Sequence, residues 1–514
     1  METCVRVPLW GRFEQTFDAV LAGNPFLDVS LHVVFRHGDS GLSVEVEGFY
    51  DGDACWRIRF MPDAVGTWTW RTRSNQPQLD GHAGMLCCTP ADADAHGPVR
   101  VQDRLHFAHA DGTPFFPFGT TSYGWAHQPD PLAERTLESL RAGPFNKIRF
   151  CVLPHHSRQS AANMPCFPFV GDPEHGWDFE RFDPAWFRLM ERRIDALAAI
   201  GVEADLILFH PYCGPWPFRR MPHETDLRYV RYLVARFASF RNVWWSLANE
   251  YDFIPEKTVE DWDDLCRETA AADPYGHLLS IHNGTVLYAQ WQPWITHACV
   301  QDGLALQLPG RAVVLRNAYH KPVIYDEFCY EGNFNVRWGN LSGEETTFRF
   351  WEALMGGTYA GHGEVVATQP GVGESEELAW TAVGGTLRGT SPERIDFLRR
   401  LVEAGAKGGW EPVDKWWQVD MARQGNERFL FWFGKESPTS WTPAIPEKEL
   451  ALVPKGRYRA EVIDAWNMTI EPVEGVLTFA KRQTGDYFFT ETTGRTIGLP
   501  GRPMMAIRLT AETE

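Results

Sequence analysis

Hydrophobic and polar residues alternate with a period of two over most of the first 100 residues. Short runs of this kind, at 43–50, 55–60 and 66–71, are separated by Gly, Asp and Pro. A period of two places alternate side chains on one buried face, as in the strands of an antiparallel sheet. No stretch in this segment keeps a helical period for three turns. The pattern therefore predicts an N-terminal β-sandwich domain over residues 1–100.

Residues 101–408 show a different pattern, in which apolar strand-like runs alternate with amphipathic helical segments. Asp183 and Pro184, for example, suit the N-cap and first position of a helix with one apolar face. Eight strand candidates are found at 115–121, 147–152, 202–209, 242–248, 278–282, 298–301, 322–327 and 358–362. This alternation predicts parallel strands closed into a (β/α)8 TIM barrel. A doubly wound sheet is the alternative, but no GxGxxG motif follows the first strand.

Residues 409–514 return to the period of two, for example at 429–433, 458–466 and 505–509. This segment is predicted to form a second, smaller β-sandwich domain. The predicted fold class is therefore α/β, a (β/α)8 TIM barrel flanked by N-terminal and C-terminal β-sandwich domains.

The charge of the chain excludes several classes of partner. The chain has 49 Lys and Arg against 67 Asp and Glu, which gives a formal net charge of −18. Such a surface repels nucleic acid and anionic lipid, so we expect neither as a partner. The 22 Trp residues point weakly to carbohydrate, because an indole face suits a sugar ring and a β-sandwich core equally well.

Localisation is predicted from the first residues, the hydropathy and the cysteines. The chain does not begin with a basic stretch followed by an apolar segment, and no apolar run approaches the ~18–20 residues of a membrane helix. None of the ten cysteines forms a CxxC pair, and several lie in apolar strand-like runs. Scattered reduced cysteines in a cytoplasmic protein are therefore expected rather than a disulfide framework.

Two strand candidates end in a carboxylate. The fourth ends in Asn249-Glu250, and the seventh ends in Asp326-Glu327. The active sites of TIM barrels lie at the C-terminal ends of their strands, so these side chains would face one another. Retaining glycosidases need a nucleophile and an acid/base ~5–5.5 Å apart. A single Glu after a strand is more often a helix cap or a surface residue, but two in these positions favour catalysis by Glu250 and Glu327.

Other polar and aromatic residues lie near the predicted strand ends. Arg149, in the second strand, is expected to brace Glu327 and keep it ionised. Asn249 is placed to reach a sugar hydroxyl. Further candidates for substrate binding are His210, His282, Asn283, Trp125 and Trp380. Each of these, taken alone, is more often structural. No metal or other cofactor is predicted, because HExxH, GxSxG and phosphate-loop motifs are missing.

The strand-end motifs resemble a known group of enzymes. The sequences WWSLANEYD at 244–252 and PVIYDEF at 322–328 are similar to the retaining, cellulase-like clan of (β/α)8 glycoside hydrolases. More narrowly, residues 112–121 and 391–400 look like the apiosidase-like barrel family. Residues 24–26 with 56–62 resemble the sandwich domain that precedes that barrel, and residues 462–470 resemble the small domain that follows it. The resemblance implies Glu250 as acid/base and Glu327 as nucleophile, with Arg149 and His210 at subsite positions.

The sequence therefore supports two hypotheses about function. The first is a retaining glycoside hydrolase that cleaves a glycosidic bond by double displacement, exo-acting on oligosaccharides or glycosides. The alternative is a non-catalytic carbohydrate-binding protein on a glycosidase scaffold. A binding protein has no need of both Glu250 and Glu327, which favours the enzyme. A lyase or esterase is a weaker third reading, because no Ser/His/Asp order supports it.

Overall fold

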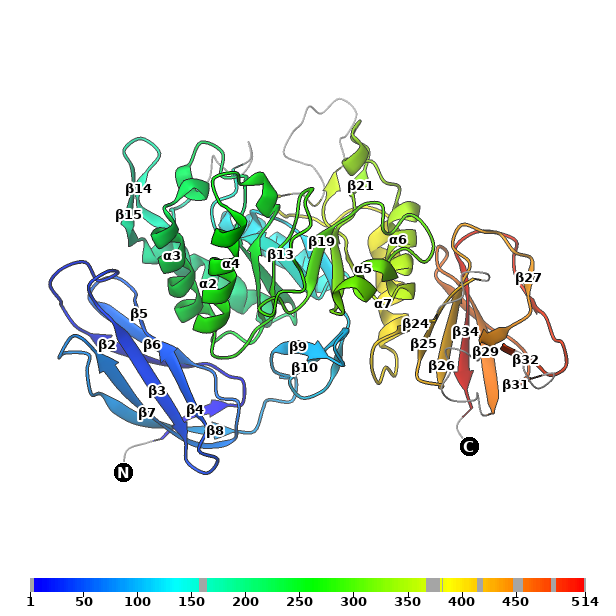
Figure 1. Ribbon diagram of the computed structural model, residues 1–514, viewed down its shortest axis with the longest axis horizontal. Coiled ribbons are helices and arrows are strands. Elements are labelled where there is room, and N and C mark those ends of the chain that lie inside the picture. The colour runs from blue at the N-terminus through cyan, green and yellow to red at the C-terminus, as the bar shows by residue number, and fades with distance from the viewer. Residues whose placement is uncertain are drawn as a thin grey trace.

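The computed structural model describes residues 4–156, 164–366, 380, 382–413, 419–446, 456–481 and 487–512. Three parts follow one another along the longest axis of the molecule (Figure 1). An N-terminal β domain lies at one end, a mixed α/β part lies in the centre and a C-terminal β domain lies at the other end. The predicted fold class is confirmed in this arrangement.

The N-terminal domain consists of two packed sheets. One has the strand order β1-β8-β7-β3-β4 and the other has the order β2-β6-β5. Their bounds are β1 (Val5–Pro8), β2 (Phe13–Asp18), β3 (Leu31–His37), β4 (Ser43–Glu47), β5 (Phe49–Tyr50), β6 (Cys55–Phe60), β7 (Gly66–Ser74) and β8 (Ala83–Thr89). Alternate apolar residues face the gap between the sheets, where the rings of Phe35 and Phe60 stack with centroids 4.0 Å apart.

Eight parallel strands form the central barrel. They are β12 (Phe118–Thr121), β13 (Lys147–Cys151), β16 (Glu203–Phe209), β17 (Val243–Ala248), β18 (Leu279–Ser280), β19 (Ala298–Gln301), β20 (Val323–Glu327) and β22 (Tyr359–Gly361). The sheet runs from β18 through β12 to β19, and a parallel bridge between His282 and Cys299 joins its two ends. Burial on both faces explains why most residues of these strands are apolar in the sequence.

Helices surround the barrel strands. Their bounds are α1 (Asp130–Ala142), α2 (Pro184–Ala198), α3 (His223–Phe237), α4 (Val259–Ala272), α5 (Val313–Tyr319), α6 (Gly343–Met355) and α7 (Ser391–Glu403). Asp183 caps α2 by accepting a hydrogen bond from the backbone N–H of Ala185 at 2.9 Å. The described segment between β18 and β19 contains no α-helix. Small sheets lie at both ends of the barrel in Figure 1: β14 (Phe169–Asp172), β15 (Gly176–Phe182) and β21 (Glu331–Gly332) above, and β9 (Val99–Gln102) and β10 (His106–His109) below.

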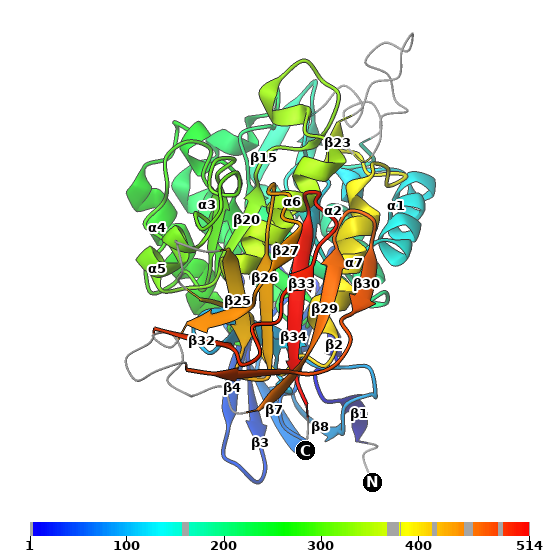
Figure 2. The ribbon, with the colours of Figure 1, turned by 90° about the vertical axis from the view of Figure 1, so that its right-hand side faces the viewer.

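The C-terminal domain packs beside α6 and α7, as Figure 2 shows from the side. Its main sheet has the order β24-β25-β26-β34-β29-β31-β32-β28, with β30 paired to β29. The bounds are β24 (Glu411–Val413), β25 (Asp420–Gln424), β26 (Arg428–Trp432), β28 (Ala444–Pro446), β29 (Arg457–Asp464), β30 (Thr469–Pro472), β31 (Leu477–Ala480), β32 (Phe488–Glu491) and β34 (Met505–Ala511). The indole of Trp432 stacks on Trp351 of α6 with centroids 4.5 Å apart, which anchors this sheet to the barrel.

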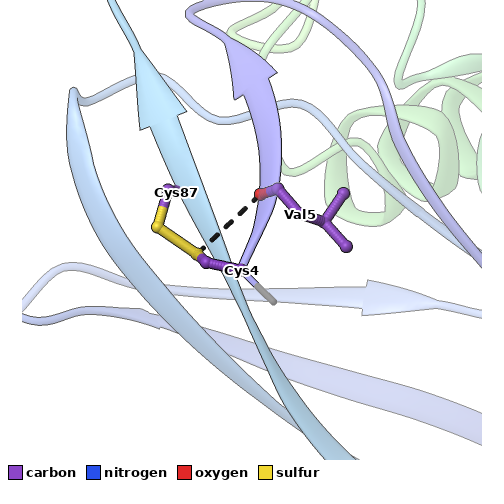
Figure 3. The surroundings of a disulfide bond; sticks show 3 residues. All are labelled: Cys4, Val5 and Cys87. Atoms are coloured by element: carbon purple, nitrogen blue, oxygen red, sulfur yellow. Dashed lines mark hydrogen bonds between the residues drawn. A yellow bond between two sulfur atoms is a disulfide. The ribbon is translucent and has the colours of Figure 1, made fainter. Parts of the chain in front are cut away.

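One disulfide corrects the expectation that all cysteines are reduced. Cys4 and Cys87 are bonded, with their Cα atoms 5.9 Å apart (Figure 3). They meet because β1 pairs in parallel with β8, although 83 residues separate them in the sequence. The other eight cysteines are free. Because disulfides persist mainly in oxidising compartments, the cysteines no longer support a cytoplasmic location. Within the described residues, no helix is long and apolar enough to cross a membrane.

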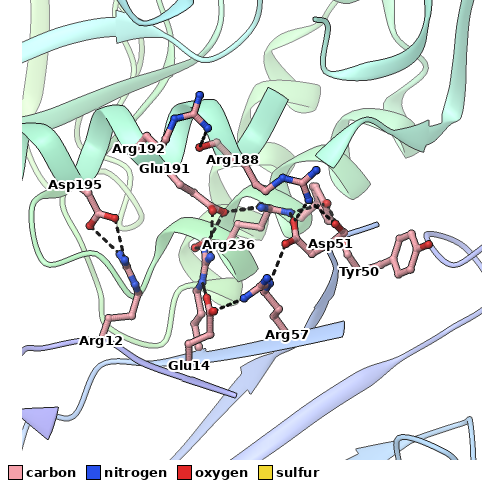
Figure 4. Close-up of polar contacts among 12 residues, drawn as sticks. Arg12, Glu14, Tyr50, Asp51, Arg57, Arg188, Glu191, Arg192, Asp195 and Arg236 are labelled. Atoms are coloured by element: carbon pink, nitrogen blue, oxygen red, sulfur yellow. Dashed lines mark hydrogen bonds and ion pairs between the residues drawn. The ribbon is translucent and has the colours of Figure 1, made fainter. Parts of the chain in front are cut away.

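A buried ion network joins the N-terminal domain to the barrel (Figure 4). Arg236 of α3 donates to Glu191 of α2 at 2.7 Å and to Asp51 of the N-terminal domain at 2.8 Å. Arg59 of β6 donates to the same Glu191 at 2.7 Å, and Arg57 of β6 donates to Asp51 at 2.8 Å. Charges from both domains therefore neutralise one another across the interface, and Arg236 is fully buried between them.

We expect Arg236→Met to lower the thermal stability of the protein. Loss of one partner from a buried ion pair lowers the free energy of unfolding, here by roughly 3 kcal/mol. This is the lower end of the range for such losses, because Arg59 and Arg57 still face the two carboxylates. Differential scanning calorimetry would show this as a lower Tm. Arg400→Met is the matched control, because Arg400 is 69% exposed and its pair with Asp396 is worth ~0–1 kcal/mol. An equal Tm for both variants would contradict this role of Arg236.

Candidate active site

The two carboxylates predicted to be catalytic lie at the C-terminal ends of their strands. Glu327 is the last residue of β20, and Glu250 follows β17 by two residues. Glu250 has left-handed backbone angles, φ 48° and ψ 53°, and begins the short 3₁₀ helix Tyr251–Phe253. Such angles are unfavourable for a residue with a Cβ atom. Both side chains are only 6% exposed.

Glu327 is surrounded by hydrogen-bond donors and one cation. The hydroxyl of Tyr123 donates to Glu327 Oε1, and the hydroxyl of Tyr330 lies 3.3 Å from that of Tyr123. The Nη1 atom of Arg149 lies 3.7 Å from the same Oε1 atom. Burial raises the pKa of Glu327, and the charge of Arg149 opposes this increase. The position of Arg149 thus matches a bracing role, although burial has the larger effect on the pKa.

Glu250 has different neighbours from Glu327. The hydroxyl of Tyr212 donates to Glu250 Oε2. Gln301 Nε2, with its amide nitrogen turned to the carboxylate, donates to Glu250 Oε1 at 3.1 Å. Burial, followed by the negative charge of Glu327, raises the pKa of Glu250 to about 7. At neutral pH this carboxyl therefore exists in both protonation states, as a general acid and base requires.

Arg149 connects Glu327 to the predicted sugar-binding amide. Its Nη2 atom donates to Asn249 Oδ1 at 2.9 Å, and both side chains are fully buried. Asn249 Nδ2 has no hydrogen-bond partner in the described part of the chain. A buried unpaired donor beside two carboxylates is available to a ligand, so a contact of Asn249 with substrate stays a prediction.

Two other predicted substrate residues, His210 and Asn283, form hydrogen bonds with the backbone, and a contact of either with substrate stays a prediction. His210 Nε2 donates to the carbonyl of Leu153, and its Nδ1 atom accepts from the N–H of Tyr212, both at 3.1 Å. Burial lowers the pKa of His210 to about 4, so it is neutral. Asn283 exchanges two hydrogen bonds of 3.2 Å with the backbone of Gln301. These two residues therefore position Tyr212 and Gln301. The ring of His282 is fully buried, and neither of its nitrogens has a hydrogen-bond partner among the described residues, so a contact of His282 with substrate stays a prediction.

The two tryptophans predicted to stack against sugar rings are core residues, which corrects that expectation. Both indoles are fully buried. Trp125 packs edge-on against Phe150 at 5.5 Å, and Trp380 donates to the Thr120 hydroxyl at 2.7 Å. A tryptophan near a strand end has the same sequence signature whether its ring turns inward or toward the mouth. The apolar surface of the barrel wall decides the inward direction here.

Sequence reasoning missed Tyr123, Tyr212, Gln301 and Tyr330. All four follow or end barrel strands, and this position is the signal that could have identified them. Asp252 lies close to Glu250 in the sequence, but its carboxylate binds the backbone of the loop after β18. Its carboxylate accepts the N–H groups of 284, 285 and 286 at 2.5, 2.7 and 2.8 Å. Within the described residues, no group of three His, Cys, Asp or Glu could hold a metal ion.

The barrel and its paired carboxylates have the architecture of glycoside hydrolases. Residues 101–364 match the family "Apiosidase-like, catalytic domain". The chain therefore belongs to the apiosidase-like family. Residues 6–75 and 416–510 match two domains of unknown function, DUF5060 and DUF5605.

Solved structures agree with this assignment. A crystal structure from Bacteroides vulgatus ATCC 8482, provisionally described as a glycoside hydrolase, is 38% identical. It covers 99% of this chain and 100% of its own, with a TM-score of 0.91. A family 5 glycoside hydrolase from the same organism is 16% identical, covers 81% of this chain and 94% of its own, and has a TM-score of 0.57, which shows the shared fold. A search of curated proteins finds no match.

The coupling between the two carboxylates can be measured without a substrate. We expect Glu327→Gln to lower the pKa of Glu250 from about 7 toward the ordinary range, because the variant removes a neighbouring negative charge. Carbon-13 NMR titration of glutamate side-chain carboxyls would detect the change, with Glu250→Gln providing the assignment. Glu203 is the internal control: its pKa of about 8 arises from burial at the other end of the barrel and should not move. An unchanged pKa of Glu250 would contradict the coupling.

Proposed function

We propose that the protein is a retaining glycoside hydrolase that works by double displacement. The observation that carries this proposal is the pair Glu250 and Glu327, which lie at the ends of the fourth and seventh barrel strands and influence one another electrostatically. Their surroundings are unequal, since Arg149 lies beside Glu327 and the charge of Glu327 raises the pKa of Glu250. Two neighbouring carboxyls in unequal surroundings are suited to the nucleophile and the general acid.

In the first step, Glu250 donates its proton to the glycosidic oxygen while Glu327 attacks the anomeric carbon. The leaving group departs with that proton, and the sugar is bound to Glu327 as an ester. Glu250, now ionised, takes a proton from water in the second step. That water attacks the anomeric carbon, frees the Glu327 carboxylate and gives a product of retained configuration. Tyr212 and Gln301 hold the two oxygens of Glu250 through both steps.

The proposal includes exo action on oligosaccharides or other glycosides. Its test is product analysis: an exo-acting enzyme releases one terminal sugar from the start of the reaction, whereas an endo-acting enzyme first gives mixed shorter oligosaccharides. Chromatography of early products from a series of oligosaccharide lengths distinguishes the two. The test applies to the first glycosides that the protein hydrolyses in a panel of aryl glycosides and oligosaccharides.

We expect Glu327→Ala to abolish turnover while the protein remains folded, because no nucleophile is left to form the glycosyl ester. Steady-state rates with aryl glycosides and far-ultraviolet circular dichroism check the two parts. A 2-deoxy-2-fluoro glycoside of the hydrolysed sugar should label the wild type at Glu327, as peptide mass spectrometry would show, and leave the variant unlabelled. Normal kcat in folded Glu327→Ala protein would contradict the assignment. Sugar binding without turnover in the wild type would favour the carbohydrate-binding alternative.

Glu250→Ala should separate substrates by their leaving groups. A sugar leaving group needs a proton, so we expect ~10²–10⁴-fold slower hydrolysis of natural glycosides. Glycosylation by a dinitrophenyl glycoside should be comparatively spared, since that leaving group is stable as an anion. Added azide should restore turnover and give a glycosyl azide of retained configuration, which NMR would identify.

Asp252→Asn is the control for this experiment. Because Asp252 binds three backbone N–H groups, its variant should show no preference for good leaving groups and no rescue by azide. Equal slowing of both substrates by Glu250→Ala, without azide rescue, would place the acid/base elsewhere.

A further inference from the structure

A third carboxyl, that of Glu364, belongs to the segment that follows the eighth barrel strand. The strand β22 ends at Gly361, and the short strand β23 (Val365–Val366) pairs with β21. Glu364 is the residue immediately before β23. Burial, followed by the negative charge of Glu327, raises the pKa of Glu364.

The backbone before Glu364 is pressed against a tyrosine of the site. Gly363 has a φ of +70°, and a Cβ atom built there would lie 2.2 Å from the ring of Tyr330. A side chain at 363 is therefore excluded, so the chain passes close to the ring. The hydroxyl of Tyr330 reaches that of Tyr123, which donates to Glu327. The close contact at 363 thus holds Glu364 next to the tyrosines that surround the nucleophile.

The carboxyl of Glu364 differs from those of Glu203 and Glu352, whose pKa values are raised to a similar level. Its Oε1 atom is buried and has no hydrogen-bond partner among the described residues. Glu203 and Glu352 also have pKa values raised to about 8 by burial, but each accepts an indole N–H at 2.8 Å, from Trp244 and Trp432. A buried polar atom without a partner is costly and needs an explanation.

We propose that Glu364 binds a hydroxyl group of the sugar that becomes attached to Glu327, and so determines which sugar the site accepts. This inference rests on the proposed glycosidase function. A carboxyl and a sugar hydroxyl can each donate and accept, so the pair satisfies the oxygen that the protein leaves unpaired. Burial and the charge of Glu327 raise the pKa of Glu364 to about 8, so it is mainly protonated at neutral pH and available as a donor.

The proposal differs from a purely structural or electrostatic role in one measurable respect. A residue that only packs against Tyr330 or adjusts the charge around Glu327 affects every substrate to the same extent. A residue that binds one hydroxyl affects only the substrates that carry that hydroxyl. A series of substrates that each lack one hydroxyl therefore separates the two roles.

The experiment uses the 4-nitrophenyl glycoside that the wild type hydrolyses best, together with its monodeoxy analogues. We expect Glu364→Ala to lower kcat/KM for the parent glycoside by ~10–100-fold, the effect of one lost hydrogen bond to an active-site group. One deoxy analogue should be hydrolysed slowly by the wild type and lose nothing further in the variant, because the interaction is already missing. Glu364→Gln keeps an acceptor and a donor and should recover most of the activity on the parent.

Glu203→Gln is the matched control, since Glu203 is a buried carboxyl with a similarly raised pKa at the N-terminal end of β16. Its relative kcat/KM values over the deoxy series should equal those of the wild type. Wild-type values for Glu364→Ala on the parent, or an equal loss over the whole series, would overturn the inference and leave the glycosidase proposal intact. A wild type that hydrolyses no glycoside and takes no label at Glu327 would overturn both.

Discussion

A buried lysine between two aspartates holds the barrel together beneath the site. Lys147 Nζ lies 2.7 Å from Asp205 Oδ2 and 2.8 Å from Asp326 Oδ1, and all three side chains are at most 1% exposed. The residues come from β13, β16 and β20, so the ion pairs join strands far apart in the sequence. Since an unpaired charge at this depth costs several kcal/mol, each residue requires the other two.

The position of Glu250 and Glu327 is tied to this buried triad through Arg149. Side chains alternate along a strand, so Lys147 and Arg149 of β13 point to the same interior. Arg149 lies 3.7 Å from Asp205 and 4.0 Å from Asp326, and its outer nitrogens reach Asn249 and Glu327. One guanidinium therefore connects the charged interior with Glu327 at the end of β20 and with Asn249, the residue before Glu250. The Lys147 and Arg149 charges also keep the pKa of Asp326 below its usual range.

The mouth of the barrel is built by residues that support others. His210 and Asn283 position Tyr212 and Gln301 through backbone hydrogen bonds, and these in turn hold Glu250. Asp252 fixes the loop after β18 against the loop after β17. The N-terminal domain is bound to α2 and α3 by ion pairs. The C-terminal domain packs on α6 (Figures 1 and 2). Most contacts of the site are thus made within the protein, whereas buried polar atoms of Asn249, His282 and Glu364 have no hydrogen-bond partner among the described residues.

The sequence alone determined the features that depend on local order. Periodicity identified the eight barrel strands, and position at the ends of the predicted strands identified Glu250 and Glu327, because the active sites of such barrels lie where the strands end. Only the tertiary structure decided the features that depend on the direction of a side chain and on contacts between segments distant in the sequence. The burial of Trp125 and Trp380, the hydrogen bonds of His210, and the Cys4–Cys87 bond belong to this group. A sequence pattern gives the place of a side chain along a strand, whereas packing of the whole barrel decides what that side chain meets.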